Sequence, residues 1–194
     1  MLAEFLQKNG VLRKIVHKAG NARARELVGR IRPFLGRNDS ILDIGSGTCN
    51  VCEILSGLGH RVTPLDVRDL SFSDSIKPVI YDGNRIPFGD NEFDKSLLLT
   101  VLHHTPDPER VLLEAKRVSR EIVMIEDIYV SRLHRRLTFL FDSLLNLEFT
   151  GHPHSNRNDG QWRETFGRLG LELVNARYRR SFLVFTHATY HLRK

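Results

Sequence analysis

The sequence predicts an α/β fold in which a largely parallel, seven-stranded sheet includes one antiparallel strand and has helices on both faces. Short apolar runs alternate with amphipathic runs of helical period, which is typical of strand–helix–strand units. A glycine-rich turn follows the first of these strands, at the position where such folds bind nucleotide-like ligands. Near the end of the chain only Arg179-Arg180-Ser181 separates two β-rich runs. That link is too short for a crossover helix, so the last two strands should pair antiparallel.

The expected elements follow one another without repeats or low-complexity stretches. Amphipathic periodicity before the first strand predicts three short helices, and Asn9-Gly10 separates the first two. These three helices are expected over 2–8, 11–18 and 21–35. The seven strands are expected over 40–44, 61–66, 78–81, 94–100, 121–126, 171–178 and 182–191. The later helices are expected over 50–58, 108–118, 131–147 and 159–168, with proline at the first turn of the second.

Length and composition indicate one globular domain spanning residues 1–194. The chain is 41% hydrophobic and 27% charged, which is ordinary for a globular protein. No apolar run approaches the roughly 18 residues of a membrane-spanning helix. The first residues show no basic stretch followed by an apolar one, as a secretory signal would have. We therefore expect a soluble, cytoplasmic protein.

Positive charge is concentrated in the N-terminal helical segment, residues 1–37. The whole chain has 29 basic and 23 acidic residues, a net charge of +6. Residues 1–37 contain nine Lys and Arg side chains against Glu4 and Glu26, a local excess of seven. Such a segment suits contact with RNA, with an anionic membrane surface or with an acidic substrate. It equally suits a helix whose charged face is simply solvated.

Cys49 and Cys52 form the only C-x-x-C pair of the chain. This spacing occurs in redox motifs and in metal sites. A zinc site would need a second pair of ligands, and these cysteines lie inside the glycine-rich turn. A packing role is therefore favoured, and no metal site is predicted.

The glycine-rich turn joins a buried strand, Ile41 to Ile44, to a helix that begins near Asn50. A dinucleotide-binding motif would need glycine where Asn50 stands. The stretch from Leu42 to Thr48 instead resembles motif I of the class I S-adenosylmethionine-dependent methyltransferases, which have a Rossmann-like fold. The resemblance implies that S-adenosylmethionine is the cofactor and that its binding residues include Asp43, Gly45, Ser46 and Gly47. Asp43 would place the methionine end, whereas Cys49 departs from the third glycine often found in the family.

Two further stretches extend the resemblance toward the nucleoside of the cofactor. Asp66 ends a strand about twenty residues beyond the glycines, where a carboxylate can accept both hydroxyls of a ribose. In the family Val67 would then lie against the adenine. Residues 81–88 resemble the motif after the third strand, in which Asp82 takes the adenine amino group and the Gly83 amide meets the ring.

The stretch Leu98 to His104 resembles the fourth-strand motif of the ubiquinone/menaquinone-biosynthesis-type subgroup, methyltransferase type 11. Residues 87–94 resemble the loop that leads into that strand. Ligands of open α/β sheets lie outside the carboxyl ends of the strands. Thr100 should therefore contact the cofactor, and His103 and His104 should lie beside the reacting methyl group. Either histidine can serve as a catalytic base, or both can orient the loop and cap the next helix.

The resemblance favours methyl transfer to a small-molecule acceptor. An RNA methyltransferase, using the basic N-terminal segment, and a cofactor-binding module without catalysis remain alternatives. Many small-molecule methyltransferases insert acceptor-binding elements after the fifth strand. Residues 131–158 are thus expected to form a lid-like helix and loop, with Phe139 or Phe149 meeting an apolar acceptor. The alternative is that this helix only covers the sheet.

Overall fold

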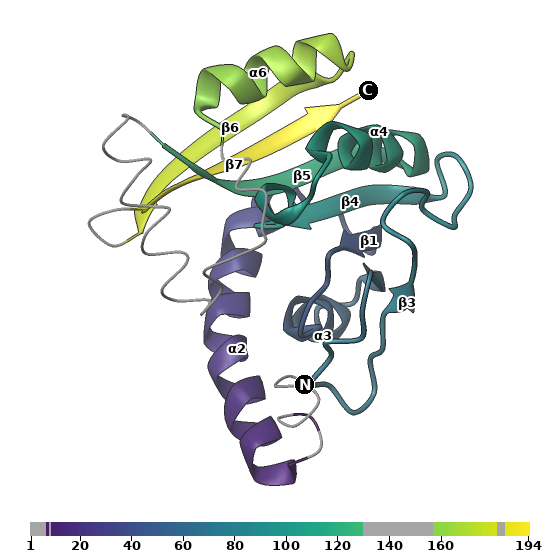
Figure 1. The fold of residues 1–194 in the computed structure, drawn as a ribbon, viewed down its shortest axis with the longest axis vertical. Coiled ribbons are helices and arrows are strands. Elements are labelled where there is room, and N and C mark those ends of the chain that lie inside the picture. The colour runs from purple at the N-terminus through teal and green to yellow at the C-terminus, as the bar shows by residue number, and fades with distance from the viewer. Residues whose placement is uncertain (1–6, 8, 130–156, 182–184) are drawn as a thin grey trace.

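The protein forms one seven-stranded sheet with helices on both faces (Figure 1). The structure, a computed structural model, describes residues 7, 9–129, 157–181 and 185–194. The strand order is β3-β2-β1-β4-β5-β7-β6, and the seven strands and mostly parallel sheet are those of the predicted fold class. The strands are β1 (Ser40–Ile44), β2 (Arg61–Asp66), β3 (Val79–Ile80), β4 (Phe93–Leu99), β5 (Ser119–Ile128), β6 (Glu172–Ser181) and β7 (Phe185–Arg193).

Strands β1 to β5 are parallel, and β7 is antiparallel to both of its neighbours, β5 and β6. This confirms the antiparallel pairing predicted for the last two strands. The predicted connection at 179–181 is wrong, because β6 continues through it and Ser181 pairs with Phe185. Arg179 and Arg180 are exposed while their backbone pairs with β7. Backbone pairing in the hairpin therefore extends the strand where side-chain polarity indicated a loop.

Two hydrophobic cores cover the two faces of the sheet. On one face pack α2 (Gly10–Ile31) and α3 (Asn50–Gly57), and on the other α4 (Pro108–Val118) and α6 (Asp159–Arg168). Successive strand residues alternate between the cores: Leu97 faces the first and Leu98 the second. This arrangement leaves the carboxyl ends of the central strands as the place where a ligand can approach.

Helix α2 is continuous, so the prediction of separate helices at 11–18 and 21–35 is wrong. The break at Asn9-Gly10 is the start of α2, where the Asn9 side chain accepts hydrogen bonds from the N–H groups of Val11 and Leu12. Gly20 lies within the helix because α3 packs there: a Cβ at Gly20 would lie 2.8 Å from Asn50 Oδ1. The glycine thus allows close packing of two helices rather than ending one. After Ile31 the chain tightens into the 3-10 turn η1 (Arg32–Phe34).

Three expectations lie partly or wholly outside the described residues. They are the first short helix at 2–8, the lid-like segment at 131–158 and the placement of Phe139 and Phe149. Among the helices that are described, none is long and apolar enough to cross a membrane.

Candidate functional site

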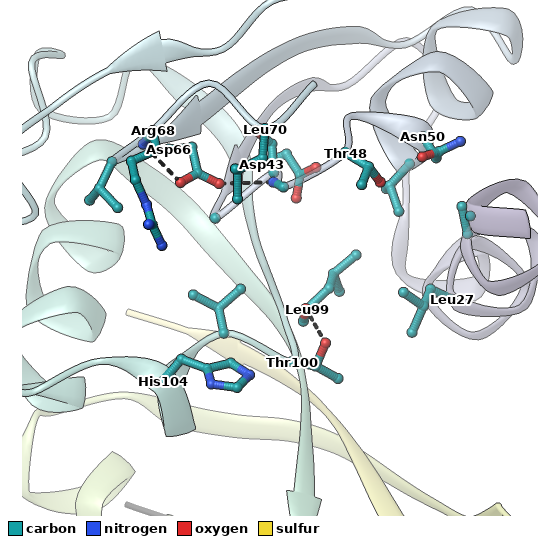
Figure 2. Close-up of a pocket in the computed structure, with 18 of the residues that line it drawn as sticks. Leu27, Asp43, Thr48, Asn50, Asp66, Arg68, Leu70, Leu99, Thr100 and His104 are labelled. Carbon is teal, nitrogen blue, oxygen red and sulfur yellow. Dashed lines mark hydrogen bonds between the residues drawn. The ribbon is translucent and has the colours of Figure 1, made fainter. Parts of the chain in front are cut away.

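A cavity of about 640 Å³ lies at the carboxyl ends of β1, β2 and β4 (Figure 2). It collects most of the predicted site residues from segments far apart in the sequence. Those that line it are Asp43, Gly45, Ser46, Gly47, Asp66, Val67, Thr100 and His104. Figure 2 shows Asp43 and Asp66 on one side of the cavity and Thr100 and His104 on the other. Asp82, Gly83 and His103 are outside the lining.

The turn after β1 exposes backbone to the cavity at two glycines with positive φ. Gly45 has φ +75°, and a Cβ there would lie 2.6 Å from Val101 Cγ2. Gly47 has φ +49°, and a Cβ there would meet nothing nearer than 4.0 Å. The first glycine is therefore required by packing against the loop after β4. The second leaves open space in the cavity into which a ligand can fit.

Cys49, at the position of the family's third glycine, adopts the left-handed conformation with φ 61°. Its side chain is fully buried, with Sγ 3.7 Å from Ser46 Oγ, and the residue is not part of the cavity lining. Its Cβ therefore does not narrow the cavity. The thiol of Cys52 donates a hydrogen bond to Asp43 Oδ2 at 3.1 Å, and both cysteines are free. Within the described residues, no three His, Cys, Asp or Glu side chains are grouped as a metal site would need.

Two buried carboxylates line the cavity with different environments. Asp66 accepts hydrogen bonds from the N–H groups of Gly47 (2.8 Å) and Arg68 (3.2 Å), one on each oxygen. Each oxygen keeps a lone pair for a ligand hydroxyl. Burial, opposed by the hydrogen bond from Cys52 and aided by the charge of Asp66, raises the pKa of Asp43 to about 6. Asp43 is thus a carboxylate that a positively charged ligand group would keep ionised.

The loop after β3 lies beside Val67 at one edge of the cavity. A Cβ at Gly83 would be 3.4 Å from Val67 Cγ1, so the glycine brings this loop close to Val67. Asp82 is exposed, and one of its oxygens accepts hydrogen bonds from the N–H groups of Asn84 (2.8 Å) and Arg85 (3.2 Å). These bonds hold the pKa of Asp82 below its usual range. In this structure the Asp82 carboxylate is engaged in its own turn.

Thr100, directly after β4, has φ 58°, a conformation that β-branched residues rarely adopt. Its N–H donates to the Ile125 carbonyl at 2.7 Å and its hydroxyl donates to the Leu99 carbonyl at 2.6 Å. Arg23 of α2 reaches across to Thr100 Oγ1 at 3.3 Å. Strained residues of this kind occur at binding sites, where the surrounding structure maintains them.

The two adjacent histidines are placed differently in the 3-10 turn η2 (Leu102–His104). His103 is buried, and its Nδ1 lies 2.7 Å from Glu126 Oε2. His104 is exposed and lines the cavity. The ring centroids are 4.0 Å apart. Only His104 is therefore in a position to contact a ligand in this cavity.

We compared the sequence and the fold with those of known proteins. The sequence profile of the methyltransferase domain family matches residues 42–122, which contain the glycine turn, Asp66 and both histidines. Residues 42–122 are thus similar to a methyltransferase domain. The match corresponds to the type 11 methyltransferases predicted from the sequence. A search of curated proteins finds no significant match.

Solved structures of methyltransferases share the fold at low sequence identity. An S-adenosylmethionine-dependent methyltransferase of Methanosarcina mazei is 18% identical with a TM-score of 0.68, covering 84% of this chain and 96% of its own. Magnesium protoporphyrin IX methyltransferase of Synechocystis, solved with bound S-adenosylhomocysteine, is 14% identical with a TM-score of 0.65, covering 96% and 88%. A putative methyltransferase of Haloferax volcanii, solved with the activator Trm112, is 14% identical with a TM-score of 0.65, covering 90% and 95%.

Sequence reasoning missed two residues that bear on this cavity. Glu126 holds His103, and Arg23 contacts Thr100 from a helix that precedes the matched domain. Glu126 stands near the carboxyl end of the fifth strand, so the position of that strand end could have indicated it. No sequence pattern marked Arg23 in the same way. Two separate helices were predicted where α2 is continuous, so the sequence did not indicate which side of the helix faces the cavity.

Proposed function

We propose that this methyltransferase transfers the methyl group of S-adenosylmethionine to a small-molecule acceptor that enters the cavity beside His104. The observation that carries the proposal is that one cavity joins the Asp43 and Asp66 carboxylates to an exposed histidine. Its volume of about 640 Å³ is within the range typical of small-ligand sites. That space suits a cofactor and part of a small acceptor.

The residues around the glycine turn fit the cofactor. Asp66 retains acceptor capacity for ribose hydroxyls, and the open space at Gly47 leaves room for the ligand. Asp43 would attract the ammonium group of the methionine end, and Val67 would contact the adenine. When bound, S-adenosylmethionine supplies a methyl group activated by a positively charged sulfur. The protein's contribution is then to align the acceptor with that group, which can lower the barrier by about 7–11 kcal/mol.

His104 is the residue that would hold a proton taken from the acceptor. It is exposed in the cavity, on the side opposite Asp43 and Asp66 (Figure 2). The ring of His103 contacts it in a tilted arrangement and is held by Glu126, so we assign His103 and Glu126 to positioning. An acceptor whose attacking atom loses no proton would not need this step.

The placement of the basic side chains supports a small-molecule acceptor over RNA in this proposal. Among the described basic residues of the segment 1–37, Arg23 alone lines the cavity. Lys14, Lys18, Arg25 and Arg32 are exposed outside the lining. A continuous basic path from this segment into the site, which an RNA acceptor would require, is not formed by those residues.

Labelled S-adenosylmethionine, incubated with the protein and a metabolite extract, tests the proposal. We expect label in a small organic molecule, unchanged when the extract is first treated with nuclease. The Asp66→Asn variant serves as control and should transfer less label. Label that appears only in RNA and disappears after nuclease treatment would contradict the small-molecule assignment.

A further inference from the structure

Helix α2 is anchored to the domain along one row of side chains. Arg13 donates to the Phe72 carbonyl at 3.2 Å, and His17 Nε2 lies 2.7 Å from Glu53 Oε2. Gly20 packs against Asn50, and Ala24 is buried in the next turn. These positions are three or four residues apart, so they share one face of the helix.

In the N-terminal half of α2 the opposite face is apolar and exposed, whereas Glu26 occupies the same face further along the helix. The apolar face is formed by Val11, Ile15, Ala19 and Ala22, of which the last three follow Val11 by four, eight and eleven residues. All four are exposed. Val11 and Ile15 precede Arg13 and His17 by two residues, roughly half a helical turn. Their side chains are 69% and 59% exposed, the highest values among the large hydrophobic residues of the described chain. Within the described residues, nothing packs on Val11 and Ile15, so this face is free to meet a partner.

A row of basic side chains, the α2 basic row, borders this apolar face. It consists of Lys14, Lys18 and Arg25 of α2 and of Arg32, the first residue of η1; they are spaced by four, seven and seven residues and are all exposed. In the described part of the chain none of the four has a carboxylate partner, whereas the helix's acidic residue, Glu26, is paired with Arg30. The charge of the row is therefore available to an anionic surface.

From this arrangement we infer that α2 docks on an anionic lipid bilayer surface, with Val11 and Ile15 in the interface and the α2 basic row facing the lipid headgroups. Helices that lie on membranes combine a shallow apolar face with flanking Lys and Arg side chains. Nucleic acid would use the basic row but would leave Val11 and Ile15 without a role. A second copy of the chain would bring two basic rows together, and Glu26 is already paired.

Co-sedimentation of the full chain with vesicles tests the inference. We expect binding to vesicles of phosphatidylserine and phosphatidylcholine in equal parts, and little binding to phosphatidylcholine alone. The double variant Lys18→Gln/Arg25→Gln should lower the partition coefficient about thirtyfold, since each basic side chain near the surface contributes about fivefold. Ile15→Ser should lower it about tenfold without any change of charge.

Matched variants on another face provide the controls. Arg85→Gln/Arg110→Gln removes two exposed arginines, and Leu113→Ser removes an apolar side chain that is 48% exposed. Both should bind vesicles as the wild type does. The inference would be overturned by absence of vesicle binding, by vesicle binding that Ile15→Ser leaves unchanged, or by a dimer in sedimentation velocity that Ile15→Ser dissociates. Binding to RNA that depends on Lys18 and Arg25 but not on Ile15, without vesicle binding, would overturn it in favour of nucleic acid.

Discussion

Glu126 Oε2 lies 2.7 Å from His103 Nδ1, and the other carboxylate oxygen accepts the N–H groups of Val101 (2.9 Å) and Leu102 (2.8 Å). A single buried side chain of β5 thus fixes the loop that follows β4. Because that loop ends in His104, Glu126 determines how the loop presents this histidine to the cavity. The relationship links a residue outside the cavity lining to the proposed chemistry.

Replacing Glu126 with glutamine should affect turnover more than cofactor binding. The amide keeps the size and one acceptor oxygen, but it loses the charge-assisted bond to His103, which costs about 1–3 kcal/mol of stability. We expect a lower kcat, a displaced pH profile of kcat and a dissociation constant for S-adenosylhomocysteine near that of the wild type. Glu172→Gln, on the exposed face of β6, serves as control. An unchanged pH profile and kcat, with only the melting temperature lowered, would make Glu126 purely structural.

The two histidines should respond differently to substitution. If the acceptor loses a proton, His104→Gln should lower kcat by about 10²–10⁴ while cofactor affinity is retained. His103→Gln should have a smaller effect on kcat and a larger one on stability, since His103 is buried against Glu126. Kinetics and thermal melting of both variants provide the measurement. Full activity in both variants would assign the pair a structural role.

Asp43 should give the domain a stability that depends on pH. Burial raises its pKa from 3.8 to about 6, so the folded state binds more protons than the unfolded state between these values. This contribution to the free energy of unfolding is complete below about pH 4 and is lost as the pH rises to 6, by about 3 kcal/mol. Denaturant unfolding of the wild type and of Asp43→Asn at several pH values measures this contribution. The difference in free energy of unfolding between the two isolates Asp43, because all other groups titrate in both proteins. A difference between the two that is constant from pH 4 to 7 would contradict the assignment.

Thr100 should show a conflict between stability and activity. Glycine adopts φ 58° without strain, so Thr100→Gly should recover about 1 kcal/mol of the cost of the left-handed conformation. The same change removes the hydroxyl that Arg23 contacts in the cavity. We expect unfolding free energy equal to or above that of the wild type, together with reduced turnover. A variant that is both less stable and fully active would contradict this account of the strain.

The sequence predicts the sheet and the glycine turn well because local signals define them. Ile41 to Ile44 is apolar, and Gly45 and Gly47 follow it directly, so no distant residue is needed to place that turn. The continuity of α2 was not predictable in this way. The reason for a glycine at position 20 is the close approach of Asn50, which lies thirty residues further along the chain. The different placement of His103 and His104 was not predictable either, because two adjacent histidines carry the same local signal.

What distinguishes His103 from His104 is Glu126, which lies 23 residues further along the chain and reaches His103 only through the pairing of β4 with β5. Cys49 illustrates the same limit. It departs from the family's glycine, but its backbone is left-handed and its side chain is fully buried, away from the cavity lining. The sequence gives the type of each side chain, and the structure is needed to show in which direction it points.

Isothermal titration calorimetry with S-adenosylhomocysteine tests the central claim most directly, using the wild type and Asp66→Asn. The account predicts one binding site per chain in the wild type. It also predicts weaker binding in the variant, by about 1–3 kcal/mol, because a ribose hydroxyl loses its charged acceptor while the amide oxygen still accepts the Gly47 N–H. If the wild type binds neither S-adenosylhomocysteine nor S-adenosylmethionine, the cavity at Asp43 and Asp66 is not the cofactor site and the account is wrong.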